Sequence, residues 1–137
     1  MCEGRGEKLR KLPNMPDCIF VVVKPEFSVS TPALYKKIDE VSIANRPNHM
    51  AMESALISGN LEQVAQNVLN VFDPVVTVDH PELNEIKSVF RQCGAISYQM
   101  TGSGSATFAI VSEHETADVI CKMLKDDYPD VFICKPV

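Results

Sequence analysis

The sequence predicts an α+β fold of the ferredoxin-like, split βαβ class, with extra helices in the first crossover. Three observations lead to this class. The apolar patterns along the 137 residues follow the order strand, helices, strand, strand, helix, strand. The strand-like runs are β-branched or alternate with a period of two, whereas the helix-like runs carry an apolar stripe. A chain of this length has the size of one domain.

The chain opens with a polar segment and then enters a buried strand. Residues 1–17 contain Pro13 and Pro16 and predict an entry segment on the surface. Residues 18–24 are continuously apolar and β-branched up to a final lysine, which is typical of a strand buried on both faces. Pro25 ends this strand because proline cannot donate to the sheet ladder.

The first helix is predicted to begin at Thr31, which serves as its cap, with Pro32 in the first turn. Its predicted buried stripe comprises Leu34, Ile38 and Val41.

Two further helices are expected in the same crossover. One spans about residues 50–58 and stops at Gly59. The next begins at Asn60, because Gln63 follows three residues later and completes a capping pattern. Its inward residues are predicted to be Leu61, Val64, Ala65 and Val68.

The middle of the chain contains one ambiguous stretch and one clear helix. The valines of residues 72–78 favour extended chain, yet Pro74 interrupts the run. Pro81 opens an amphipathic helix that Gly94 closes. The apolar face of this helix comprises Leu83, Ile86, Val89, Phe90 and Cys93.

The last part of the chain predicts two strands, a helix and a strand. Ile96, Tyr98 and Met100 alternate with polar residues, and residues 106–111 form a second, mostly buried run. Ser112 and Glu115 then form a capping box for a helix. Its inward residues are Ala117, Ile120, Cys121 and Leu124, and the final strand covers residues 131–134.

Composition narrows the class of protein. A hydrophobic content of 45% and a charged content of 23% are typical of a globular domain. The net charge of −5 disfavours binding to a nucleic-acid backbone. We expect no membrane span, because no apolar run approaches about 20 residues, and the polar N-terminus does not resemble a signal peptide.

The five cysteines are odd in number and include no CxxC pair. A disulfide framework or zinc site is therefore not expected, and we predict free thiols in a reducing cytoplasm. Four of them, Cys18, Cys93, Cys121 and Cys134, lie inside apolar patterns and are predicted to pack in the core.

The loop of residues 101–105, Thr-Gly-Ser-Gly-Ser, lies between two predicted strands. Two glycines interleaved with hydroxyl residues let the backbone bend sharply and present N–H groups at close range. Such a concavity suits an anion, most often phosphate. The loop is therefore either a phosphate-facing element or an ordinary glycine-rich hairpin.

Several local patterns occur together in one known family. These are Gly-Arg-Gly-Glu at 4–7, Val-Lys-Pro at 23–25, Val-Ser-Thr at 29–31 with Tyr35 after it, Gly-Ala at 94–95, and residues 100–109. In this order they resemble the C-terminal half of the 4-diphosphocytidyl-2-C-methyl-D-erythritol kinases. That family belongs to the galactokinase, homoserine, mevalonate and phosphomevalonate (GHMP) kinase superfamily, and the resemblance runs from about Gly4 to the end.

The resemblance implies an ATP-dependent kinase, with Mg²⁺, of the non-mevalonate isoprenoid pathway. It would phosphorylate the 2-hydroxyl of 4-diphosphocytidyl-2-C-methyl-D-erythritol. Residues 102–105 (Gly102, Ser103, Gly104 and Ser105) match the family motif that helps to shape the ATP pocket. Tyr35 matches an aromatic position that stacks on the cytosine ring, or it packs over the first helix. Ser30 and Thr31 would face the same pocket, although a cap role also explains Thr31.

The sequence departs from the family in one respect. The family's GGGSS-type phosphate loop, its catalytic lysine and its aspartate base are absent. We therefore expect no catalytic residue and no metal ligand here, and a kinase domain missing from the N-terminal side. Residues 1–17 would be the entry segment from that domain, and 18–137 the C-terminal domain. By itself the chain is predicted to be inactive and to bind no cofactor stably.

Two alternatives remain open. One is a non-catalytic ferredoxin-like module that binds a small ligand or regulates another protein. The other is a different GHMP kinase, such as a mevalonate or homoserine kinase, whose substrate has no cytidine to stack on Tyr35.

Overall fold

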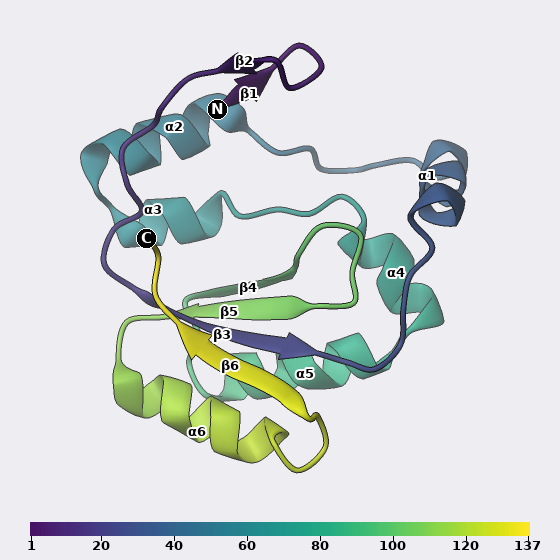
Figure 1. Cartoon of the computed structure of the whole chain (residues 1–137), viewed down its shortest axis with the longest axis vertical. Coiled ribbons are helices and arrows are strands. Elements are labelled where there is room, and N and C mark those ends of the chain that lie inside the picture. Colours follow the sequence, from purple (N-terminus) through teal and green to yellow (C-terminus); the bar gives the residue numbers. More distant parts are fainter.

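A four-stranded antiparallel sheet organises the molecule (Figure 1). The computed structural model describes residues 1–137, apart from the side chain of Glu3. The strands are β3 (Ile19–Lys24), β4 (Ser97–Met100), β5 (Thr107–Val111) and β6 (Asp130–Cys134), in the spatial order β4-β5-β3-β6. This spatial order, with α5 before β4 and α6 before β6 in the sequence, is that of the split βαβ plan. The predicted fold class is confirmed.

The helices divide into two groups. Helices α5 (Glu82–Gln92) and α6 (His114–Leu124) pack on one face of the sheet. The remaining helices lie in the connection from β3 to β4, as predicted for the first crossover (Figure 1). They are α1 (Thr31–Glu40), α2 (His49–Ser58), α3 (Leu61–Gln66) and α4 (Asp73–Asp79).

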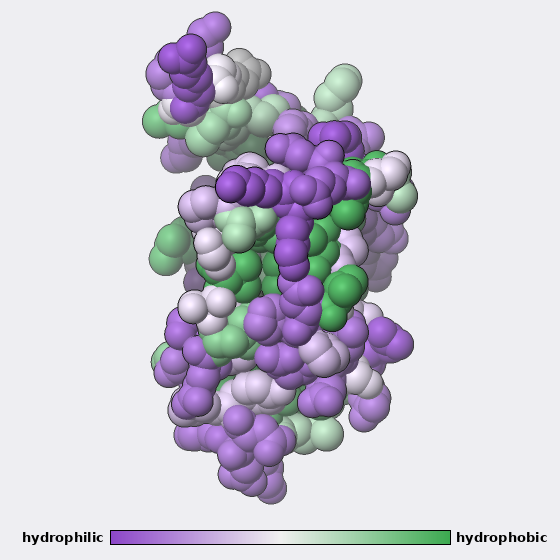
Figure 2. All heavy atoms as spheres, turned by 90° about the vertical axis from the view of Figure 1, so that its right-hand side faces the viewer, coloured by the Kyte–Doolittle hydropathy of each residue, from purple (hydrophilic) through white to green (hydrophobic). Residues whose placement is uncertain are grey.

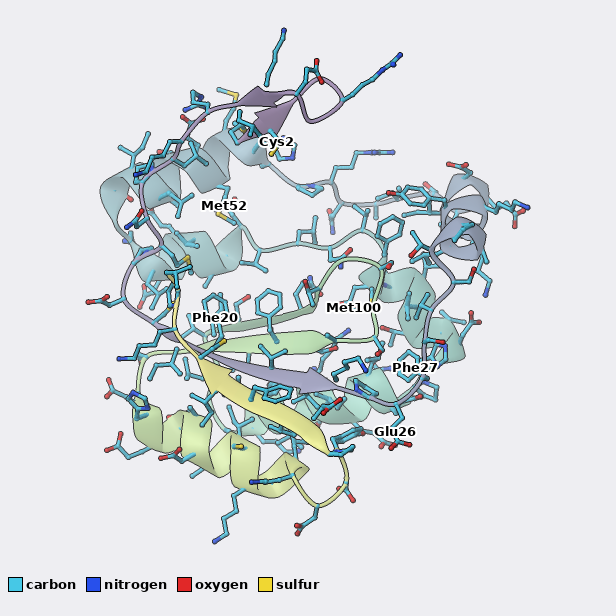
Figure 3. The ribbon with its side chains drawn as sticks, in the orientation of Figure 1. Cys2, Phe20, Glu26, Phe27, Met52 and Met100 are labelled. Atoms are coloured by element: carbon cyan, nitrogen blue, oxygen red, sulfur yellow. The ribbon has the colours of Figure 1, made fainter. Side chains whose placement is uncertain are left out.

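The core lies between the sheet and the two helices α5 and α6. In β3, Ile19, Val21 and Val23 are buried because alternate side chains of a strand point to the same face. Phe20 lies on the opposite face, turned toward α2 and α3 (Figure 3), and is only half-buried. The prediction that β3 is buried on both faces was therefore too strong, because one face is buried and the other is only half-buried. The helices contribute Leu83, Ile86, Phe90, Ala117, Ile120 and Leu124 to the core.

Local capping signals placed α2 and α3 correctly. Gly59 follows α2 with a φ of 65°, the left-handed conformation that glycine adopts at a helix end. The Asn60 side chain accepts a hydrogen bond from the Gln63 N–H at 3.0 Å and so starts α3, as predicted. Val64 and Ala65 are buried.

Three local predictions were wrong or incomplete. The ambiguous stretch at 72–78 is helical, because Pro74 occupies the first turn of α4, where its missing N–H costs nothing. Val41 does not belong to the buried stripe of α1: it is the residue after the helix and is 46% exposed. The predicted capping box at Ser112 and Glu115 does not form, since Glu113 is the N-cap of α6 and makes no side-chain cap bond.

The N-terminal segment is exposed, as predicted, but it contains a small hairpin. Strands β1 (Cys2–Glu3) and β2 (Lys8–Leu9) pair antiparallel. This hairpin lies at one end of the molecule (Figures 1 and 2), near α2, where Arg10 just after β2 forms an ion pair with Glu53 of α2. No helix in the described part of the chain combines the length and the apolar content that crossing a membrane requires.

The cysteines are less buried than predicted. All five thiols are free, but only Cys18 is buried. Cys93 and Cys121 are half-buried at the edges of their helices, and Cys2 and Cys134 are exposed. An apolar local pattern therefore did not ensure burial: Cys134 is the last residue of β6, which lies at the edge of the sheet.

Candidate functional site

The loop of residues 101–105 forms a tight turn between β4 and β5. The Thr101 N–H donates to the Ala106 carbonyl at 2.8 Å, and the Gly104 N–H donates to the Thr101 carbonyl at 3.1 Å. Gly102 and Gly104 have φ values of 57° and 92°, in the region that favours glycine. The sharp bend inferred from the two glycines is therefore present.

The two glycines have different surroundings. A Cβ atom on Gly104 would lie 2.8 Å from the Met100 Sδ and 3.3 Å from the Val29 Cγ2, so this position is closely packed. A Cβ atom on Gly102 would meet no atom within 4 Å. Gly102 is thus the exposed point of the loop, where a ligand can approach the backbone.

Ser103 joins the loop to the start of α1. Its Oγ lies 2.9 Å from the Oγ1 of Thr31, within hydrogen-bond distance. The prediction that Thr31 caps α1 was wrong: Ser30 is the N-cap and makes no side-chain cap bond. Because the Thr31 hydroxyl turns to Ser103, the structure brings two predicted substrate-binding residues, Ser30 and Thr31, next to the predicted phosphate loop.

Tyr35 lies one helical turn after Thr31, and therefore on the same face of α1. Its side chain is 56% exposed. The ring meets Phe72 edge-on, with 5.1 Å between centroids and an interplanar angle of 80°. An edge-on neighbour fixes the orientation of the ring and leaves the exposed ring available to a flat ligand. That Tyr35 stacks on the cytosine ring of a substrate stays a prediction.

Ser105 has a structural contact. It is 5% exposed, and its Oγ donates to the Pro25 carbonyl at 3.1 Å. This bond ties the end of the loop to the end of β3. Of the two serines in the loop, Ser103 is the one whose hydroxyl faces α1 at the surface.

Asn70 holds the base of the loop, and the sequence analysis did not identify it. Its Nδ2 donates to the Met100 carbonyl at 2.7 Å and to the Gly102 carbonyl at 2.8 Å. Its Oδ1 accepts from the Phe72 N–H at 2.9 Å. Asparagine often forms a local turn of this kind, with its side chain bonded to the backbone two residues later. The bonds from Asn70 to residues 100 and 102 leave no pattern in the sequence around Asn70, so they could not be predicted.

Asp73 also binds Met100, the residue just before the loop. It is 4% exposed, and its Oδ2 accepts from the Met100 N–H at 3.1 Å. Its Oδ1 forms an ion pair with Lys87 of α5 and accepts from the Thr77 hydroxyl at 3.0 Å. A buried carboxylate is unfavourable unless a positive charge or a hydrogen-bond donor compensates it. The ammonium group of Lys87 supplies that positive charge, so Asp73 can be buried in its ionised form.

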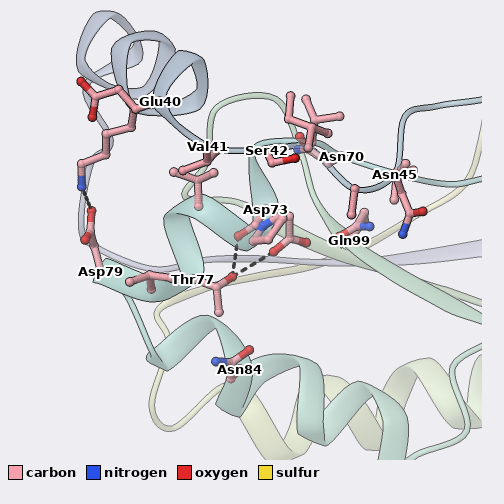
Figure 4. Close-up of a pocket in the computed structure, with 18 of the residues that line it drawn as sticks. Glu40, Val41, Ser42, Asn45, Asn70, Asp73, Thr77, Asp79, Asn84 and Gln99 are labelled. Carbon is pink, nitrogen blue, oxygen red and sulfur yellow. Dashed lines mark hydrogen bonds and ion pairs between the residues drawn. The ribbon is translucent and has the colours of Figure 1, made fainter.

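A groove of about 980 Å³ lies beside these residues (Figure 4). Its lining comes from the end of α1, the 41–45 segment, α4, α5 and β4. Asn70 and Asp73 line it as well as holding the loop. On the face that carries α1 and α4, apolar atoms gather near the middle, and hydrophilic side chains surround them and also cross between them (Figure 2).

Within the described part of the chain, no three His, Cys, Asp or Glu side chains lie close enough together to hold a metal ion. These residues thus offer no such cluster for the Mg²⁺ that the resemblance implies.

The fold and the loop together define a class of protein. A family model described as GHMP kinases C terminal matches residues 52–130. That range is more than half of the chain and includes the loop and its supports at Asn70, Asp73 and Lys87. The chain belongs to the GHMP kinase family and represents its C-terminal domain.

The particular relatives share one name. The chain is 39% identical over 125 residues to the 4-diphosphocytidyl-2-C-methyl-D-erythritol kinase of Caldicellulosiruptor bescii, covering 91% of this chain and 44% of that protein. It is 34% identical over all 137 residues to the kinase of the same name from Clostridium botulinum strain Langeland, covering 49% of that protein. The chain thus spans about half the length of the curated relatives that it matches.

Solved structures agree on the fold. The crystal structure of a 4-(cytidine 5'-diphospho)-2C-methyl-D-erythritol kinase superposes with a TM-score of 0.74 and 24% identity, over 97% of this chain and 47% of that one. A homoserine kinase from Cytophaga hutchinsonii gives a TM-score of 0.68 and 16% identity, over 93% and 44% of the two chains. At these identities the likeness shows the fold alone.

Proposed function

We propose that this chain is the substrate-binding C-terminal half of an ATP-dependent kinase. The kinase phosphorylates the 2-hydroxyl of 4-diphosphocytidyl-2-C-methyl-D-erythritol in non-mevalonate isoprenoid biosynthesis. The observation that carries the proposal is the similarity to kinases of that name along almost the whole chain. The contact between the 101–105 loop and the start of α1 supports it, because it joins the two segments that the substrate and the nucleotide would share.

The loop would act through its backbone. Phosphoryl transfer requires donors that are already in position around oxygens that carry charge. The exposed backbone at Gly102 is suited to this, because glycine has no side chain and no atom lies within 4 Å of the position where a Cβ would be, so a phosphate can approach. ATP and its Mg²⁺ would lie between this loop and the N-terminal kinase domain that the relatives' length implies.

Tyr35 would hold the cytidine end of the substrate. Stacking of a base on an aromatic ring contributes about 1–3 kcal/mol in single-strand binding proteins. Tyr35 is exposed and its ring orientation is set by Phe72. Ser30 and Thr31, one turn earlier, would face the same ligand.

The test is phosphoryl transfer by the native protein that carries this chain. We would supply ATP, Mg²⁺ and 4-diphosphocytidyl-2-C-methyl-D-erythritol, and detect the phosphorylated product by phosphorus NMR and mass spectrometry. Mevalonate and homoserine serve as competing acceptors in parallel. Product from the cytidine substrate alone supports the proposal. Product from mevalonate or homoserine alone would assign a different GHMP kinase, and no product from any acceptor would refute a kinase role.

A variant pair tests the cytidine contact. Tyr35→Ala is expected to raise KM for the cytidine substrate by about tenfold or more, given the stacking energy. Tyr35→Phe keeps the ring and is expected to remain within about twofold of the native KM. Equal KM values for the native protein and Tyr35→Ala would remove Tyr35 from the binding site.

We propose that the 137 residues alone have no kinase activity. They contain no GGGSS-type loop and no recognisable catalytic lysine or aspartate motif. Purified 1–137, checked for a folded circular dichroism spectrum, is expected to give no ATP-dependent transfer. Measurable turnover would show that the catalytic groups lie within this chain.

A further inference from the structure

We propose that Asn70, together with the buried Asp73–Lys87 pair, positions the 101–105 loop so that the backbone N–H groups of Gly102 and Ser103, and not the loop carbonyls, face the phosphates of the nucleotide. The proposal rests on the proposed kinase function and goes beyond the loop itself. It assigns positioning residues to a segment, 70–87, in which neither the sequence motifs nor the family resemblance placed any functional residue.

The direction of the loop carbonyl groups determines whether an anion can approach the loop. Carbonyl oxygens carry partial negative charge and repel phosphate, whereas backbone N–H groups attract it. The Asn70 amide donates one hydrogen bond to the Met100 carbonyl at 2.7 Å and one to the Gly102 carbonyl at 2.8 Å. Asn70 thereby turns the carbonyls on either side of Thr101 toward itself and away from an incoming anion.

The orientation of the Asn70 amide is itself determined. Its Oδ1 accepts from the Phe72 N–H at 2.9 Å, so its two N–H groups point at the loop. A primary amide has two donor hydrogens, and both are used here on loop carbonyls. No other amide orientation satisfies all three backbone groups, so Asn70 acts as a fixed clamp.

Asp73 completes the clamp on Met100. Its Oδ2 accepts from the Met100 N–H at 3.1 Å, so side chains bind both backbone polar groups of the residue just before the loop. The Asp73 carboxylate is buried, and Lys87 of α5 neutralises it. The base of the loop is thus attached through charge-assisted contacts to α4 and α5, the packed part of the fold.

The test uses Asn70→Asp in the native protein that carries this chain. This isosteric change keeps the acceptor for Phe72 but replaces the two donors with a carboxylate oxygen that faces two carbonyls. The matched control is Asn84→Asp, because Asn84 lines the same groove and, among the described residues, makes no side-chain bond to the loop. Both variants add one negative charge, so a difference between them reports the donors.

Two readouts decide the proposal. In Asn70→Asp, the amide hydrogens of Thr101 and Gly104 are expected to exchange at least about tenfold faster than in Asn84→Asp, while those of β3 keep their native rates. KM for ATP is expected to rise by about tenfold or more, with KM for the cytidine substrate within about twofold. The ratio of variant to native kcat/KM is expected to rise as pH falls, because a protonated carboxyl regains one donor.

The outcomes separate this proposal from the proposed function. Native loop exchange in Asn70→Asp would overturn the positioning role, whatever the activity. A fall in kcat with both KM values unchanged and a lower Tm would also overturn it, because that pattern indicates lost folded protein. If the native protein transfers no phosphoryl group, the kinase function fails, and amide exchange alone then decides whether Asn70 holds the loop.

Discussion

The hydroxyl oxygens of Thr31 and Ser103 lie 2.9 Å apart, although 72 positions separate these residues along the chain. This contact joins the first turn of α1 to the glycine loop. It places a residue of the VST segment beside the Gly-Ser-Gly segment, and both segments are among the parts of the sequence that carried the family resemblance. The contact therefore brings these two segments together in space.

The first prediction concerns this contact. Thr31→Val and Ser103→Ala, made singly and together, are expected to show a coupling of about 0.5–1.5 kcal/mol in a double-mutant cycle on unfolding in urea. Thr31→Val combined with Ser58→Ala is the control pair, because the Ser58 hydroxyl bonds to Ala55 within α2. Strict additivity for Thr31 and Ser103 would show that the hydroxyls do not interact in solution.

The two loop glycines are expected to respond differently to substitution. Both alanines incur left-handed strain of about 1–2 kcal/mol, but only Gly104→Ala places a Cβ against Met100, so it should destabilise the protein more than Gly102→Ala. Gly102→Val should instead lower kinase activity by orders of magnitude while unfolding stays cooperative. Urea unfolding and kcat/KM measure the two effects. Equal destabilisation by both alanines would contradict the packing at Gly104.

Lys87→Met is expected to destabilise the protein by about 3–5 kcal/mol, because it leaves the buried Asp73 carboxylate without a counter-charge. Adding Asp73→Asn should recover part of this loss, since the side chain then carries no charge but keeps an acceptor for Met100. Lys36→Met, on the exposed surface of α1, is the control. A loss below about 1 kcal/mol for Lys87→Met would mean that the pair is solvated.

Stability at acid pH should depend on Asp79. The hydrogen bond and charge of Lys37 hold the pKa of the Asp79 carboxyl below its ordinary value of 3.8. A lowered folded-state pKa stabilises the protein above the ordinary pKa, and this contribution is lost as pH falls through the lowered value. Asp79→Asn should therefore be slightly less stable than the native protein at neutral pH and equal to it near pH 2. In about 1 M salt the difference should shrink, because this pair is exposed.

Thiol reactivity should follow exposure. Burial raises the pKa of the Cys18 thiol, and the nearby Asp17 carboxylate and Cys134 add to this effect. At neutral pH a maleimide is expected to label Cys2 and Cys134 first and Cys18 last, since the thiolate is the reactive form. Peptide mass spectrometry at successive times gives the order in which the thiols are labelled. Labelling in urea serves as the reference in which all five cysteines react. Early labelling of Cys18 would contradict its burial.

The sequence predicted the parts of the fold that depend on local patterns. The β-branched run of β3 and the apolar stripe of α5 each carry a strong periodic signal, and Gly59 and Asn60 mark helix ends. Residues 72–78 were ambiguous because valine favours strands, while Pro74 suits either a strand break or a first helical turn.

The site could be predicted only in part. The glycine loop and Tyr35 have local or family patterns, so they were found before the structure. Asn70 and Asp73 were missed because their partners lie 27 to 32 positions further along the chain. Thr31 was assigned as a cap for a similar reason: its preceding and following residues fit a helix start, but its actual partner is Ser103.

The clamp on Met100 has one more consequence. β4 is an outer strand of the sheet, and the outward-facing N–H and carbonyl of its last residue are already bonded to Asp73 and Asn70. An outer strand with unpaired backbone groups invites a strand of a second molecule to add to it. By occupying these groups, the two side chains also protect this margin of the sheet against edge-to-edge aggregation.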